Sequence, residues 1–407
     1  MRLTSLIFAI IFIFSLFGMS EGAEFSMRPS IMIGEEYNDN IHLQKDKIDD
    51  YITRVQPSIE LEYREPRWEL DLSYLLDFSY YAKGTRTDDL THAIDAKGHM
   101  EILREFFFLN IKDSYRRVSL DIARDFTKES QFERQSDRNI FDLNPYFVLK
   151  PGSLITVTTG YIFSDIWYKE ETAVNRREYI AYSDLVYELS SRVTLNAGYK
   201  YTQDDAEEMD YSKNDVSFGS RYNYAGESFV FITVGNSWLD FDKVKSSSQI
   251  FWNAGITHIF PAVTVSLESA LEYIQDPDGS LVRRDNYVMS VRKVGDKISL
   301  GTYISFREFR NAVNKMLDTR SYGIGGDCRY EFTSRLAGTV NFTYERFEEE
   351  LFDAKTRSYR PVLKIEYILS EGLTLAFIDQ YTDSYSLEIE ENNYKNNRVM
   401  VQVKKDF

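Results

Sequence analysis

The sequence predicts an all-β fold: a transmembrane antiparallel up-and-down β-barrel of about 20 strands (18–22), after a cleaved signal peptide. Apolar and polar residues alternate strictly over long stretches, which places them on opposite faces of an extended chain. The runs hold about a dozen residues, whereas soluble strands average about 5–6 and a tilted bilayer crossing takes about 9–11. The connections alternate between short and long, as at the two rims of a membrane barrel.

The first 23 residues are typical of a secretory signal peptide. A basic start at Arg2 is followed by an apolar run from Leu3 to Phe17 and then by small residues. We expect cleavage between Ser20 and Ala23. The apolar run is short for a spanning helix of about 20 residues, so an N-terminal anchor is the less favoured alternative. Residues 24–407 then form a single barrel domain.

The mature chain shows the clearest alternation near its start. Every second residue from Val55 to Tyr63 belongs to one face, and a turn at Arg64-Glu65-Pro66 follows. Every second residue from Trp68 to Tyr80 is then aromatic or Leu. No helix presents such a pattern as one stripe. The pattern recurs along the chain and is weakest over residues 106–126, where three successive Phe blur it.

The connections predict the strand count. The tight ones begin at residues 64, 150, 190, 225, 261, 295 and 370. The longer polar ones include residues 82–89, 128–137, 203–210, 276–280, 311–315, 348–355 and 388–393. This rhythm gives an even number of strands with both ends in the periplasm.

Aromatic residues are expected at both membrane interfaces. By strand direction, one rim should hold Tyr63, Trp68, Tyr187, Tyr222, Tyr224, Phe260, Tyr330, Tyr367 and Phe407. The other should hold Tyr80, Tyr201, Tyr273, Phe306, Tyr344 and Tyr359. A water-soluble β-sandwich or propeller with an aromatic core remains the alternative.

The last alternating stretch covers residues 396–407. Val399, Val401, Val403 and Phe407 share one face, and polar residues occupy most of the other. This stretch resembles the closing strand of bacterial outer-membrane barrels, whose end is read by the barrel-assembly machinery. The resemblance implies that these four residues form a C-terminal insertion signal.

Composition excludes several classes of protein. The net charge of -16 argues against a nucleic-acid partner, because binding phosphates requires clustered Lys and Arg. The single cysteine, Cys328, excludes an internal disulfide and a paired-cysteine metal site.

Residues 36–61 carry a family resemblance. Glu36-Tyr37-Asn38-Asp39-Asn40-Ile41 contains Tyr-x-Asp-Asn-Ile, and Asp49-Asp50-Tyr51-Ile52-Thr53 precedes Val-x-Pro-x-Ile at residues 55–59. This resembles the β-barrel porin family associated with PEP-CTERM and exopolysaccharide export loci, although Ser58 stands where Gly is common. The resemblance implies a Gram-negative outer-membrane barrel encoded near polysaccharide or surface-protein export systems, and it carries over no catalytic residue.

No catalytic, metal or cofactor site is predicted. The histidines are His42, His92, His99 and His258, and the strand pattern brings none of them into a nucleophile–base–acid set. His92 and His99 are separated by an odd number of residues, so we expect them on opposite faces. The oxygens of Glu35, Glu36, Asp39 and Asn40 suit calcium, but an ordinary solvated loop is favoured.

The inward-facing charges are the candidate functional residues. By parity they are Glu60, Glu62, Glu69, Asp71, Asp77, Lys97, Lys200, Arg221, Glu268, Glu272, Arg329, Glu345, Arg360 and Lys364. Charged barrel interiors hold water and set solute selectivity. The alternative is that these charges are salt-bridged fillers that brace the wall.

These observations favour an outer-membrane pore for small polar solutes or a surface polysaccharide, without catalysis. The alternative is a structural or assembly scaffold of a surface-polymer or exosortase-linked system, and an outer-membrane hydrolase is the third hypothesis. The expected partners are outer-membrane lipid and lipopolysaccharide, the barrel-assembly machinery and periplasmic polysaccharide-export proteins. No cofactor and no nucleic acid are expected.

Overall fold

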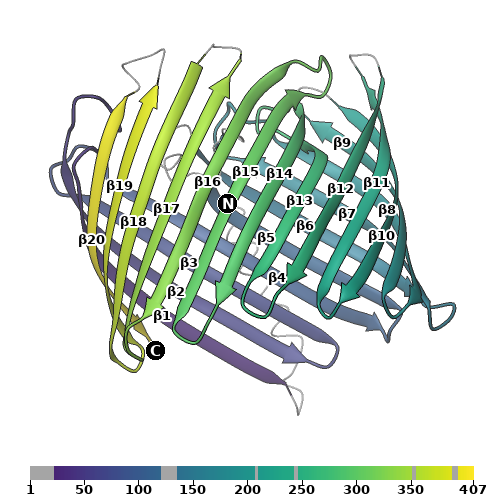
Figure 1. The fold of residues 1–407 in the computed structure, drawn as a ribbon, viewed down its shortest axis with the longest axis horizontal. Helices are drawn as coiled ribbons and strands as arrows, with labels where there is room; N and C mark the ends of the chain where they lie inside the picture. The colour runs from purple at the N-terminus through teal and green to yellow at the C-terminus, as the bar shows by residue number, and fades with distance from the viewer. Residues whose placement is uncertain (1–22, 121–134, 207–209, 243–245, 351–353, 387–392) are drawn as a thin grey trace.

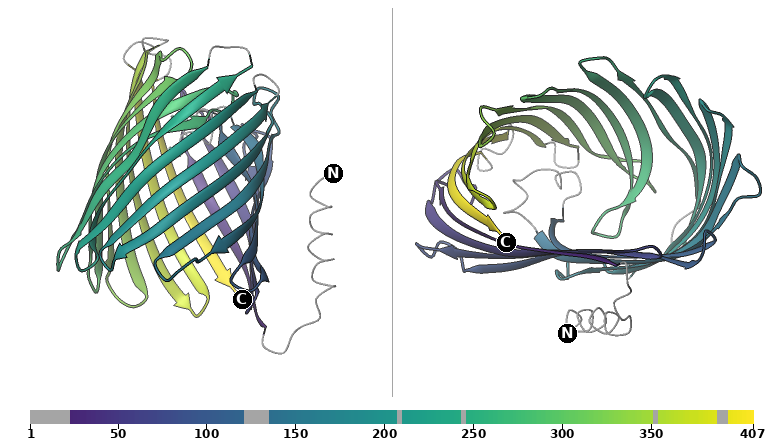
Figure 2. Two further views of the ribbon diagram at one scale, coloured as in Figure 1. Left: turned by 90° about the vertical axis from the view of Figure 1, so that its right-hand side faces the viewer. Right: turned by 90° about the horizontal axis from the view of Figure 1, so that it is seen from below.

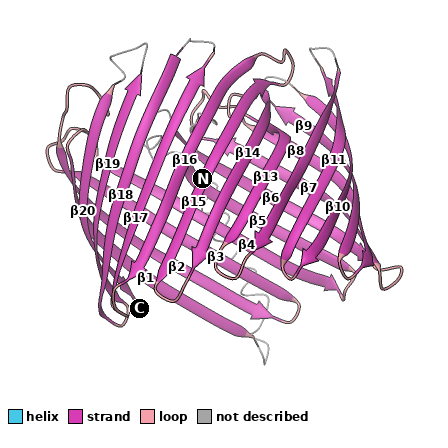
Figure 3. Cartoon of the chain, in the orientation of Figure 1, coloured by secondary structure: helices cyan, strands magenta, loops and turns pink. Residues whose placement is uncertain are grey.

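The fold consists of strands joined by turns and loops (Figure 3). A computed structural model describes residues 23–120, 135–206, 210–242, 246–350, 354–386 and 393–407. Residues 1–22, which hold nearly all of the expected signal peptide, lie outside the described residues. In the described part of the chain, no helix is long and apolar enough to cross a membrane. The strands are β1 (Glu24–Asn38), β2 (Asp50–Glu65), β3 (Trp68–Tyr81), β4 (Asp89–Leu103), β5 (Phe107–Ser119), β6 (Gln135–Leu149), β7 (Ile155–Tyr168), β8 (Arg176–Ser190), β9 (Val193–Ala206), β10 (Tyr211–Ala225), β11 (Ser228–Phe241), β12 (Ser247–Ile259), β13 (Thr264–Gln275), β14 (Leu281–Val294), β15 (Ile298–Asn311), β16 (Leu317–Glu331), β17 (Leu336–Glu349), β18 (Ala354–Ser370), β19 (Leu373–Ser386) and β20 (Tyr394–Asp406).

These strands form one closed antiparallel sheet. Each strand pairs with the next in sequence, and β1 pairs with β20 over nine residue pairs from Ser30↔Asp406 to Asn38↔Arg398. The start of β1 and the end of β20 therefore lie at the same rim (Figure 1). Seen along the barrel, the purple and blue strands form a flattened side (Figure 2). The predicted barrel of about 20 strands is confirmed.

The outer face of the barrel is apolar. Large side chains at alternate positions remain exposed in the isolated chain, among them Phe218 at 67%, Ile250 at 60% and Ile304 at 57%. Cross-strand pairs keep these residues on one side of the sheet, as Phe218↔Val234 and Val234↔Trp252 show. Lipid would cover this surface, and a fully covered side chain of this size gains roughly 1.5–3 kcal/mol. Exposed aromatic residues mark the two rims: Phe25, Tyr222, Phe260, Tyr330 and Tyr367 at one, and Tyr51, Tyr80, Trp238, Tyr359 and Tyr385 at the other.

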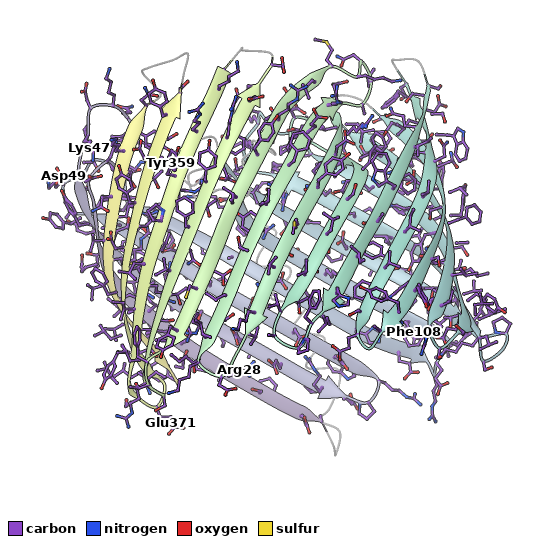
Figure 4. All side chains as sticks on the ribbon, viewed as in Figure 1. Arg28, Lys47, Asp49, Phe108, Tyr359 and Glu371 are labelled. Atoms are coloured by element: carbon purple, nitrogen blue, oxygen red, sulfur yellow. The ribbon has the colours of Figure 1, made fainter. Side chains whose placement is uncertain are left out.

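The two rims differ in the length of their connections. From the strand bounds, one rim has connections of two to five residues, and the other has connections of four to 15. Lys47 and Asp49 lie at the long-loop rim, whereas Arg28 and Glu371 lie at the short-turn rim (Figure 4). The two-residue turn after β18 uses Gly372 at φ +67°, a backbone conformation that glycine adopts without steric cost. By analogy with known barrels, the short-turn rim faces the periplasm.

Candidate functional site

The charged residues that were predicted from strand alternation to face inward do lie on the inner wall. Cross-strand pairing places all 14 predicted residues on the face opposite the exposed apolar side chains, as Glu62↔Asp71 and Asp71↔Lys97 illustrate. Many of them form ion pairs with neighbours: Arg64–Asp71 at 2.5 Å, Lys97–Asp95 at 2.8 Å, Arg284–Glu272 at 2.5 Å and Arg329–Glu366 at 2.9 Å. Lys97 and Asp95 remain about half exposed, at 58% and 48%. The wall therefore presents both signs of charge to the interior.

A buried charge cluster joins the first strand to the last. Arg398 of β20 donates two hydrogen bonds to the Glu36 carboxylate of β1, at 2.8 and 2.9 Å. Arg54 of β2 lies 3.2 Å from the same carboxylate and 3.7 Å from Asp77. The Glu36 side chain is only 1% exposed. One buried carboxylate thus holds two guanidinium groups across the seam where the barrel closes.

Asparagine side chains extend this contact at the long-loop rim. Asn396 of β20 donates to Asn38 Oδ1 at 2.5 Å and to the Asn40 carbonyl at 3.0 Å. Asn40 in turn donates to the carbonyls of Gln44 and Lys395. We call Glu36, Asn38, Asn40, Asn396 and Arg398 the seam latch. The Tyr-x-Asp-Asn-Ile motif therefore has a structural role, which is to join β1 to β20.

The oxygens considered for calcium have protein partners. Glu36 binds Arg398, Asp39 accepts the Asn397 N–H at 2.7 Å, and Glu35 accepts the Thr53 hydroxyl at 2.7 Å. No group of three or more potential metal-ligating side chains is found among the described residues.

The wall is interrupted between β12 and β13 in its half nearer the long-loop rim. The ladder between these strands ends at Trp252↔Leu271. Residues 247–251 of β12 still pair with β11, but residues 272–275 of β13 have left the ladder. β13 continues to pair with β14 up to Gln275↔Leu281. β14 in turn stays paired with β15 down to Val282↔Asn311, so the gap is confined to the edge between β12 and β13.

The hairpin folds into the barrel. Tyr273 and Leu281 belong to the outer face by parity, yet they pack against Tyr211, Leu239 and Phe241, which belong to the inner face of β10 and β11. This contact requires the hairpin to lie inside the wall. We call residues 272–284 the inner hairpin.

The tip of the inner hairpin reaches the loop between β7 and β8. The Val174 N–H donates to the Pro277 carbonyl at 2.8 Å. Val174 also packs against Gly279, so a Cβ added there would lie 3.3 Å from the Val174 Cβ. The tip therefore joins two connections that lie six strands apart in the sheet.

The inner hairpin contacts β9 through polar groups that are incompletely hydrogen-bonded. Gln275 Nε2 donates to Asp204 Oδ1 at 3.4 Å, and Arg176 Nε lies 3.8 Å from Asp204 Oδ2. Among the described residues, buried atoms without a hydrogen-bond partner include Arg176 Nε, Thr202 Oγ1, Asp204 Oδ2 and Gln275 Oε1. These atoms make the contact weaker than a fully hydrogen-bonded one would be.

Sequence reasoning missed the inner hairpin. The sequence pattern predicted residues 276–280 only as a polar connection, because the part that folds inward consists mainly of strand ends. One available signal was the loss of alternation: Tyr273 is followed by Ile274, and Leu281 by Val282.

Three histidines have aromatic or amide partners. His92 Nδ1 lies 2.8 Å from the Tyr74 hydroxyl on the outer face, and His99 Nδ1 lies 2.7 Å from Asn110 Oδ1 on the inner face. His258 Nδ1 lies 2.8 Å from the Tyr224 hydroxyl.

At the long-loop rim, the hydrogen bond that Lys83 donates to Asp49 raises the pKa of the Lys83 ammonium.

The insertion-signal residues occupy the outer side of β20. Val399 pairs with Asp379, Val401 with Phe377 and Val403 with Leu375, and Phe407 is 73% exposed. Their role in insertion stays a prediction.

Comparisons with known proteins give the fold. No family model and no curated protein matches the chain. The FrpB iron transporter of Neisseria meningitidis (F3-3 variant) matches with a TM-score of 0.54 and 10% identity, over 93% of this chain and 81% of that one. The siderophore receptor PirA of Pseudomonas aeruginosa matches with 0.53 and 10% identity, over 94% and 80%. The chain has the fold of an outer-membrane β-barrel. The closed sheet and its apolar outer face place this barrel in the bacterial outer membrane.

Proposed function

We propose that the barrel is a water-filled pore that passes small polar solutes or a surface polysaccharide across the outer membrane without catalysis. The half-exposed charge pairs of the inner wall, such as Lys97–Asp95, are the observation that carries this proposal. A sheet of this many strands encloses more space than its own side chains fill. Charged groups that stay solvated in that space favour water and polar solutes over lipid.

The inner hairpin narrows this pore at the long-loop end. Its contact between Val174 and Pro277 spans part of the interior, so the open pore is constricted rather than uniform. The net charge of -16 favours cations and neutral solutes over anions.

The comparisons support a transport function only in that the matched proteins share the barrel fold. The matched proteins are named as an iron transporter and a siderophore receptor. At 10% identity this likeness is limited to the fold, so iron is not proposed as the solute. The resemblance of residues 36–61 to the PEP-CTERM-associated family supports a role beside surface-polymer export, with periplasmic polysaccharide-export proteins as partners.

Single-channel recording in planar bilayers tests the proposal. We expect discrete open steps, with a reversal potential in a potassium chloride gradient that indicates cation preference. The Asp71→Lys variant should shift that potential toward anions. A matched change at Ser217, also on the inner wall but without a charge, to Asn should leave it unchanged. A folded barrel that stays silent and co-purifies with periplasmic proteins would instead support the scaffold.

A further inference from the structure

Two parallel rows of aromatic, histidine and amide side chains lie on the inner wall of β4–β8. The first, the ring row, contains Phe108, Tyr146 and Tyr182, which are brought together by the pairs Phe108↔Tyr146, Tyr146↔Gly160 and Gly160↔Tyr182. The second, the amide row, contains His99, Asn110 and Asn144, which are brought together by His99↔Asn110 and Asn110↔Asn144. Both rows share the inner face with Lys97 and Glu69.

Rings stack on one another at the β4–β6 end of the two rows. The Phe108 and Tyr146 centroids are 5.2 Å apart with planes inclined by 17°, and His99 stacks on Phe108 at 5.7 Å and 19°. These side chains are half-buried. They therefore form an aromatic stack that still has area available to a solute.

Gly160 makes the ring row continuous across β7. A Cβ at this position would lie 2.6 Å from the Tyr182 hydroxyl oxygen and 2.7 Å from the Tyr146 Cβ. Any larger residue would push the two tyrosines apart. The absence of a side chain at Gly160 thus leaves room for side chains from β6 and β8 to approach each other over the strand between them.

The amide row supplies hydrogen-bonding groups along the edge of the rings. The Tyr182 hydroxyl donates to Asn144 Oδ1 at 3.1 Å, and Asn110 Oδ1 lies 2.7 Å from His99 Nδ1. These contacts orient both amides. Amides can donate and accept, so they match the hydroxyl groups of a neutral solute.

We propose that the ring row and the amide row bind saccharides. A pyranose has one apolar C–H face and a rim of hydroxyl groups, so it can cover a ring while its hydroxyls reach the amides. A purely apolar solute would cover the rings but would make no use of the hydrogen-bonding groups beside them. The rows themselves contain no Lys or Arg, although Lys200 of β9 pairs with Tyr182 at the end of the ring row. This inference deepens the proposed pore by naming its solute class, and it rests on that proposed function.

The rows also have a direction. Phe108 lies toward the short-turn rim (Figure 4), whereas Tyr182 is the seventh residue of the 15-residue strand β8. A saccharide following the ring row would therefore pass from near the short-turn rim to the middle of the barrel.

Block of the pore current by neutral glucans tests the inference. Maltohexaose and cellohexaose are added to bilayers that hold the purified barrel, and the half-blocking concentration is measured. We expect block of the wild type, and about a tenfold higher half-blocking concentration in the Tyr146→Ala/Tyr182→Ala variant. Tyr146→Phe, which keeps the ring, should behave as the wild type.

Tyr303→Ala is the matched control. The Tyr303 ring also lies over a glycine, since a Cβ on Gly325 would be 2.5 Å from it, but it belongs to β15 on another part of the wall. We expect no change in glucan block. If the double variant does not fold, Asn144→Leu keeps the rings and removes an amide, and it should also weaken the block.

The outcomes separate the inference from the proposed function. A conducting pore that neither glucan blocks, or equal block in wild type and Tyr146→Ala/Tyr182→Ala, overturns the saccharide site and leaves the pore intact. A silent barrel overturns the pore. In that case calorimetric titration of the detergent-solubilised barrel with maltohexaose and cellohexaose decides the site: binding lost in the double variant supports it, and no binding overturns it.

Discussion

Removing Arg398 from the seam latch should destabilise the barrel far more than removing Arg28, although both arginines lie on the inner face beside the β1 seam. Arg398 is 11% exposed and forms a two-bond contact with Glu36, which is 1% exposed. Removing one partner of a buried ion pair costs about 3–5 kcal/mol. Arg54 still contacts Glu36 at 3.2 Å, so we expect the lower part of this range for Arg398→Ala.

Arg28 is the matched control for that variant. It pairs with Glu60 and Glu62, and the three side chains are 54%, 59% and 40% exposed. Exposed ion pairs contribute about 0–1 kcal/mol. The Arg28→Ala variant should therefore stay close to the wild type.

Urea unfolding in lipid vesicles measures both variants, with the folded fraction read from heat-modifiable gel migration. The expected result is a free energy of unfolding lowered several times more by Arg398→Ala than by Arg28→Ala. Equal losses in the two variants would refute the reasoning, because they would mean that the seam gains nothing from the buried contact. A loss in Arg398→Ala that is restored by raising salt would also contradict it, since a buried pair is poorly screened.

Three further predictions follow from other contacts. With Cys328 replaced by Ser, the double variant Val174→Cys/Gly279→Cys should form a disulfide on oxidation, because the two Cβ atoms would lie 3.3 Å apart, near the usual separation of about 3.8 Å. A non-reducing gel detects the cross-link, and its absence would place the inner hairpin elsewhere. Gly160→Ala should lower the free energy of unfolding by about 1–3 kcal/mol through overpacking, as measured in urea, and an unchanged value would contradict the ring contact. Asn40→Ala removes the side chain that ties the β1–β2 loop to two carbonyls, so trypsin should cut that loop faster than in the wild type; equal rates would count against the latch.

The number of strands and the face on which each side chain lies could be predicted from the sequence, because the alternation of apolar and polar residues is a local property. The inward position of Asp71 follows from counting residues within one strand. The seam latch could not be predicted in this way, because Glu36 and Arg398 are 362 positions apart. The contact of Val174 with Pro277 depends likewise on how far the inner hairpin bends into the barrel. No local sequence pattern predicts the extent of that bend. The ring row was missed because its residues alternate normally within each strand and become adjacent only across the ladder.

The gap between β12 and β13 leaves an alternative partner for the inner hairpin. Continuing the register of Trp252↔Leu271 would set Glu272–Gln275 opposite Ser248–Phe251. If the inner hairpin lay outward, it would form the missing hydrogen bonds of the β12–β13 ladder. It would then lose the contact of Leu281 with Tyr211. Each regained pair of residues would contribute about 0.5–1.5 kcal/mol net, so an outward position of the hairpin, which would widen the passage, would also complete the wall.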